Sequence, residues 1–127
     1  MNETLLNNLR ALADSTKHRL PEGWKSELNN CNEPYFHSRG SNGYATTWAV
    51  PSLPVESILD LLFRLARAIE GKGDIVFGRG QLGGGDWLVD DGNGLWECRC
   101  FDYGNAESEA EALLQCIFAA TKVAADV

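Results

Sequence analysis

Cysteine and histidine are the side chains in this sequence that best suit nucleophilic or metal chemistry. No CxxC or HxxxH spacing, which zinc sites commonly use, occurs among them. Cys31 or Ser41 could serve as a nucleophile activated by His37, but the sequence offers neither pair an oxyanion donor or a third partner. We therefore predict no catalytic residue, no metal site and no cofactor. The residues considered are Cys31, Cys98, Cys100, Cys116, His18 and His37.

Glycines and acidic residues form two further patterns that resemble ligand-binding motifs. Gly78, Gly80 and Gly83 have GxGxxG spacing, but a dinucleotide site requires a helix that begins within the glycine run. Two more glycines and a predicted hairpin follow instead, which indicates a connection between strands. Asp86 and Asp90 do not fit the alternating ligand positions of a calcium loop, so we assign the acids near the hairpin to turns.

Charge is distributed unevenly along the chain, whose formal net charge is −7. Residues 1–50 contain five acids and five bases, whereas residues 51–127 contain 13 acids and 6 bases. An acidic surface repels nucleic acid and anionic membranes, and favours basic partners or simple solubility. Because no apolar run approaches the roughly 18 residues of a membrane span and the N-terminus lacks a secretory pattern, we expect a cytoplasmic protein with reduced cysteines.

Hydrophobic periodicity predicts a single α+β domain over residues 1–127. Residues 1–50 are predicted to form an N-terminal helix and an aromatic-rich irregular region, and residues 51–127 a core of helix, hairpin and helix. The expected order is α-β-α-β-β-β-α, with a three- or four-stranded, mainly antiparallel sheet packed by three helices. The predicted helices cover 3–16, 54–70 and 106–124, and the predicted strands cover 43–50, 74–77, 86–90 and 95–101.

Local signals support these elements. Asn2 and Asn105 are predicted N-caps, and Gly71 is a predicted C-terminal stop. In the strand 95–101, alternation places Trp96, Cys98 and Cys100 on the face expected to be buried. The helix 54–70 is apolar around most of its circumference, so it must be covered either by the first helix or by a second copy of the chain, which makes a homodimer plausible.

Aromatic residues concentrate between positions 24 and 48, among Asn, Ser and Gly. Tyr, Trp and Arg are enriched in interface hot spots, so this segment is a candidate contact surface; the alternative is that its rings cover the core. Trp48 is assigned to the core. The predicted partner-binding residues are Tyr35, Phe36, Arg39 and Tyr44, together with the acids Asp86, Asp90, Asp91, Glu107 and Glu111.

The helix ILDLLFRLARAI, the strands DWLVD and LWECRC, and the closing segment FDYGNAESEAEALLQCIFAA share a pattern with a known group of domains. In this stretch, about residues 55–124, the chain resembles the small phage-encoded ABA-sandwich domains. The glycine-rich insertion at 78–85 and the first 50 residues depart from that pattern. The resemblance implies a phage or prophage accessory protein, with no assigned activity and no catalytic residues to transfer.

These observations favour a non-enzymatic protein that binds and inhibits a bacterial protein or complex by occluding a basic surface. By analogy with other small acidic phage proteins, the expected role is anti-defence, similar to that of anti-CRISPR proteins. A toxin-neutralising immunity protein fits the size and acidity equally well. The alternative from another class is a small enzyme that uses a metal or the cysteine and histidine residues.

Overall fold

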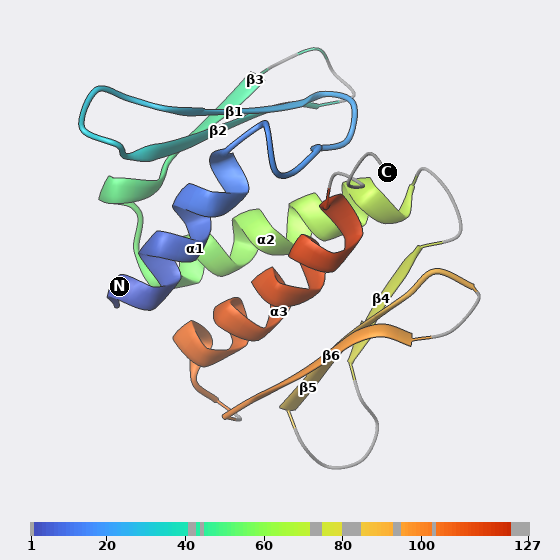
Figure 1. Cartoon of the computed structure of the whole chain (residues 1–127). Helices are drawn as coiled ribbons and strands as arrows, with labels where there is room; N and C mark the ends of the chain where they lie inside the picture. The colour runs from blue at the N-terminus through green and yellow to red at the C-terminus, as the bar shows by residue number, and fades with distance from the viewer. Residues whose placement is uncertain are drawn as a thin grey trace.

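Three helices lie between two three-stranded antiparallel sheets in the described part of the chain (Figure 1). This computed structural model describes residues 2–40, 43, 45–71, 75–79, 85–92, 95–102 and 104–122, with the backbone alone for 79, 85 and 95–98. The helices are α1 (Glu3–Ala13), α2 (Val55–Glu70) and α3 (Ala106–Thr121), with a short 3-10 turn at Val50–Ser52. The strands are β1 (Trp24–Leu28), β2 (Pro34–Arg39), β3 (Ala45–Ala49), β4 (Val76–Arg79), β5 (Gly85–Asp90) and β6 (Leu95–Phe101).

The α+β class, the three helices and the antiparallel pairing are as predicted. The strands divide into the sheets β1-β2-β3 and β4-β5-β6, on opposite sides of the helical layer (Figure 1). No helix within the described ranges is long and apolar enough to cross a bilayer.

The N-terminal helix begins where the sequence predicts and ends three residues earlier. The Asn2 side chain accepts a hydrogen bond from the Leu5 amide at 2.8 Å, which confirms the predicted N-cap. The helix ends at Ala13 because the Asp14 carboxylate accepts from both the amide and the hydroxyl of Thr16, at 2.9 and 2.6 Å. Such local bonds offer the backbone an alternative to another helical turn.

The apolar helix α2 is covered within the chain. It packs against α3 and β4, and the ring of Phe63 lies 5.5 Å from that of Trp87 on β5. On the other side, the guanidinium of Arg64 lies 5.8 Å from the ring centre of Trp48 on β3. Contacts within the chain therefore cover this helix without a second copy of the protein. The homodimer stays a prediction.

The last helix α3 has the predicted cap. Asn105 accepts from the amides of Glu107 and Ser108, at 3.1 and 3.2 Å. Its apolar side joins the core that α1 and α2 also build, and the helix ends at Thr121. Fully or almost fully buried positions of α3 are Ala110, Ala112, Leu113, Leu114, Cys116 and Ile117.

The sheet β1-β2-β3 contains two strands that the sequence pattern did not indicate. Residues 24–28 and 34–39 were assigned to an irregular region, whereas the predicted strand 43–50 is present as β3. In the ladder, Phe36 lies opposite Ser26 and Trp48, and this face of the sheet covers the helices. The opposite face carries Lys25, Glu27, Tyr35, His37, Arg39 and Thr47.

The sheet β4-β5-β6 has the predicted hairpin, with β4 shifted to 76–79. Trp87 and Val89 on β5 are buried, and Phe101 on β6 packs against the core. Cys100 is exposed, so the prediction that it faces the core is wrong. The reason is the register, which pairs Gly85 with Phe101 on the inner face and Asp86 with Cys100 on the outer face. The side chains of Trp96 and Cys98 lie outside the described residues.

Candidate functional site

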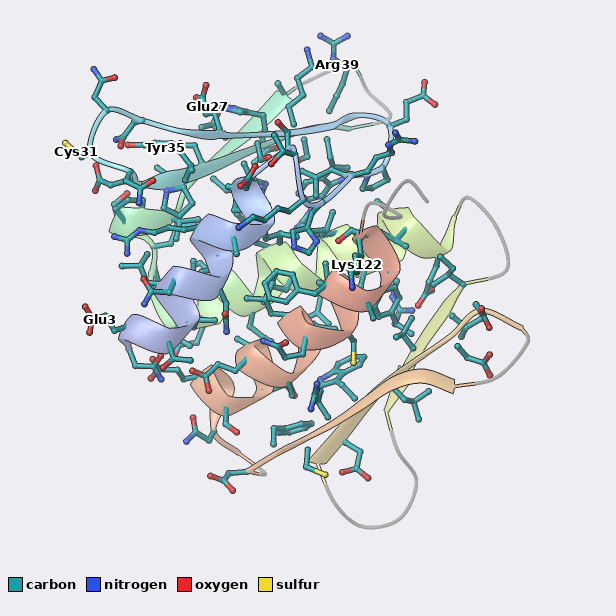
Figure 2. All side chains as sticks on the ribbon, viewed as in Figure 1. Glu3, Glu27, Cys31, Tyr35, Arg39 and Lys122 are labelled. Atoms are coloured by element: carbon teal, nitrogen blue, oxygen red, sulfur yellow. The ribbon has the colours of Figure 1, made fainter. Side chains whose placement is uncertain are left out.

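The imidazole of His37 lies at the centre of the outer face of β1-β2-β3. Its Nδ1 is 3.1 Å from Thr47 Oγ1, and its Nε2 is 3.1 Å from Glu27 Oε1. Hydroxyl, imidazole and carboxylate thus form a chain across three strands, with Glu27 pointing away from the helices (Figure 2). All three side chains reach solvent, and the Glu27 side chain is 63% exposed. These hydrogen-bonded side chains therefore lack the water-excluded setting that strengthens catalytic charge stabilisation.

The nucleophile considered for His37 lies elsewhere. Cys31 is exposed in the turn between β1 and β2, where its amide donates to Asn29 Oδ1 (Figure 2). Ser41, the second nucleophile considered, lies outside the described residues. Within the residues that the structure covers, no group of three or more His, Cys, Asp and Glu side chains is placed to hold a metal ion.

The predicted aromatic contact residues separate onto two faces of the sheet. Tyr35 and Arg39 lie on the outer face of β2, on either side of His37. Phe36 is fully buried on the inner face and is a core residue, because alternate residues of a strand point to opposite sides. Tyr44 lies outside the described residues.

The predicted acidic contact residues are divided between the sheet on the other side of the helical layer and the helix α3. Asp86 and Asp90 are partly exposed on the outer face of β5, and Asp91 follows the strand. The Glu107 carboxylate accepts from the Asn2 amide, and Glu111 has one carboxylate oxygen that is buried without a hydrogen-bond partner among the described residues. Glu111 is thus partly withdrawn from solvent. The outer face of β2 and the acids of β5 cannot form one continuous contact surface, because the helices separate the two sheets (Figure 1).

A cleft that the sequence did not indicate surrounds His18. Its first part has a volume of ≈ 520 Å³ and lies between the end of α1, the segment after it and the end of α3; Lys17, Phe118 and Lys122 line it. Its second part, ≈ 420 Å³, continues toward β1, where Arg19 and Trp24 line it. Thr16 and His18 belong to both parts.

The position of the His18 ring is set by contacts with α3. The ring stacks on Phe118 with centroids 4.7 Å apart, and Nδ1 lies 3.1 Å from Thr121 Oγ1. The backbone amide of Arg19 donates to the Thr121 carbonyl at 2.8 Å, and this bond holds the segment after α1 against the end of α3. Burial lowers the pKa of the imidazole; Asp14 opposes this effect, and the ammonium groups of Lys17 and Lys122 add to it.

Three exposed cations border this cleft: Lys17, Arg19 and Lys122. None forms an ion pair within the described residues, where the pairs between arginine and carboxylate are Arg64–Asp60 and Arg67–Glu70. The only sequence signal for this site is the run Lys17-His18-Arg19, because Phe118 and Lys122 join it through the fold.

Comparison of this chain with protein-family models, with curated proteins and with solved structures finds no match. The candidate sites are therefore interpreted from their own geometry.

Proposed function

We propose that this chain is a non-enzymatic protein that binds a bacterial protein and occludes a basic surface on it. The observation that supports the proposal is the outer face of β4-β5-β6. Asp86 and Asp90 lie there on the central strand and form no ion pair within the described residues. Because buried Trp87 and Val89 alternate with these acids, the pleat directs both carboxylates to the same side.

Apolar and weakly polar groups accompany the acids on this face. Val76, which pairs with Asp90, is 56% exposed, and Cys100, which pairs with Asp86, is exposed. A protein interface combines an apolar centre with a polar rim, and complementary charge mainly increases the association rate and the selectivity for a partner. A partner with Lys and Arg around a small apolar patch would match this face.

The resemblance to phage accessory domains suggests the class of partner. A phage protein that acts on its host would meet bacterial complexes, and defence complexes that hold nucleic acid present basic surfaces. We therefore propose an anti-defence role by occlusion, similar to that of anti-CRISPR proteins. The second face, with Tyr35 and Arg39, lies on the far side of the helices and is not part of this contact (Figure 1).

The experiment is affinity capture from bacterial lysate with the wild-type chain and two charge-reversed variants. Asp86→Lys with Asp90→Lys reverses the proposed contact, and Glu3→Lys with Glu27→Lys makes the same charge change elsewhere (Figure 2 labels both control residues). The expected result is a basic protein retained by the wild type and the control but lost from the contact variant, with urea unfolding showing that all three fold.

Equal capture by the three chains would reject the acidic face as the contact. Capture of a toxin encoded beside the gene would instead identify an immunity protein. A stoichiometric metal ion in the purified protein would favour the enzyme alternative.

A further inference from the structure

The hydrogen bonds of His18 determine which of its nitrogen atoms is free for a ligand. The Thr121 hydroxyl donates its single proton to the Ile117 carbonyl at 2.8 Å, so its oxygen accepts from His18 Nδ1. Nδ1 therefore bears a proton, and the neutral ring has its lone pair on Nε2. No hydrogen bond to Nε2 is present in the described part of the chain.

The charge around this ring is cationic. Lys17 and Lys122 border the first part of the cleft, and Arg19 borders the second. In a chain with a net charge of −7, three exposed cations that form no ion pair with any described residue lie at one place. The acid nearest the ring is Asp14, whose carboxylate accepts both the hydroxyl and the amide of Thr16. These bonds lower the pKa of Asp14 and hold its charge toward the Thr16 turn.

The floor of the cleft is apolar. The exposed side of the Phe118 ring and Ala119 line the first part beside Ala11, and the ring of Trp24 lines the second. Pockets for small molecules generally measure about 300–1,000 Å³ and combine apolar walls with a few oriented polar groups. The first part alone, at ≈ 520 Å³, falls in this range.

We propose that the cleft around His18 binds a small ligand whose anionic group, a phosphate or a carboxylate, is attached to an aromatic or apolar body. The anion lies between the ammonium groups of Lys17 and Lys122, and the body covers the apolar floor near Phe118. This site does not rest on the proposed protein-binding function, because it uses none of the residues of the acidic face.

Protonation of His18 accompanies binding. A neutral Nε2 presents a lone pair, which repels an anion, whereas the protonated ring donates a hydrogen bond from Nε2. Burial, Lys17 and Lys122 disfavour this proton and Asp14 favours it, and a bound anion offsets the two lysines. Binding therefore takes up a proton, and affinity increases as the pH falls into the range where the imidazole becomes protonated.

The test uses NMR titration of the full chain with phenyl phosphate, with benzoate and, as a neutral control, with benzyl alcohol. Both anions should shift the His18 and Phe118 ring signals saturably, with dissociation constants on the order of 1 mM or below. Benzoate stays ionised above about pH 5.5, so its affinity should be several-fold higher at pH 5.5 than at pH 7.5. The stronger of the two anions identifies the class, phosphate ester or carboxylate.

Matched variants test the location. Lys17→Gln and Lys122→Gln should each weaken binding about threefold, and both together about tenfold. Arg39→Gln removes an exposed cation that lies outside the cleft and forms no ion pair with the residues that the structure describes, so it should leave the affinity unchanged. Absence of saturable shifts, equal binding of benzyl alcohol, or equal weakening by Arg39→Gln would overturn the proposal.

Discussion

Replacement of Phe36 by alanine distinguishes a core residue from a contact residue at a position that the sequence assigned to a partner surface. The ring is fully buried on the inner face of the central strand β2, opposite Ser26 and Trp48. Removing a buried phenyl ring costs about 3–5 kcal/mol, through lost transfer free energy and the cavity that remains. A domain of this size has a free energy of unfolding of about 5–15 kcal/mol, so the variant loses a large part of its stability.

Urea unfolding followed by far-UV circular dichroism measures this loss. Tyr35→Ala is the matched control, because its side chain lies on the outer face of the same strand; we expect about 1 kcal/mol or less. Phe36→Leu, expected to cost about 1–2 kcal/mol, keeps the comparison measurable if Phe36→Ala does not fold. Equal costs at positions 35 and 36 would refute the assignment of the two faces of β2.

Three further perturbations test the turn, cap and charge assignments by urea unfolding. Gly23→Ala should cost about 1–2 kcal/mol because Gly23 has φ +87°, although a Cβ there would make only an ordinary contact. Asn105→Ala should cost about 1 kcal/mol by removing the bonds to two amides at the start of α3. Because burial lowers the pKa of His18 below 6.5 in the folded chain, the unfolded chain binds more protons as the pH falls from 7. The free energy of unfolding should therefore decrease below about pH 6.5, and His18→Gln should reduce this decrease.

Helices were predictable here because their signals are local. The caps Asn2 and Asn105 act within three residues of their own positions, and the apolar stripe of α2 repeats over four turns. The hairpin of β5 and β6 was predictable for the same reason, since Asp-Gly-Asn-Gly lies between two short aromatic strands. Signals of this kind need no knowledge of what packs against them.

The strands β1 and β2 depend on packing instead. In β1, Trp24 and Ser26 face the helices while Lys25 and Glu27 face solvent, but a serine at an inward position hides the alternation. Ser26 is accommodated because its hydroxyl donates to the carbonyl of Ala13 at the end of α1, 2.9 Å away. That bond exists only once the helix and the strand have met, so no local pattern indicates it.

The prediction of which face of β6 is buried was wrong for a related reason. Alternation shows which residues share a face but not which face meets the core, and by sequence both faces of β6 carry a large apolar residue, Trp96 on one and Phe101 on the other. The strand β5 determines which face of β6 is buried. Trp87 and Val89 of β5 face the core, and the register between the strands places Phe101 on the same face. One strand of a hairpin thus fixes the orientation of the other.

The cleft around His18 is a further feature that depends on segments far apart in the sequence. Its cations come from positions 17–19 and 122, and the two segments meet through an isolated antiparallel bridge between His18 and Lys122. The histidine takes its tautomer from a threonine hydroxyl 103 positions away, which in turn is oriented by the carbonyl of its own helix. Within the described residues, the position of the Nε2 lone pair beside the ammonium groups of Lys17 and Lys122 is therefore a property of the folded chain, and a titration of the folded chain is the measurement that can show what it binds.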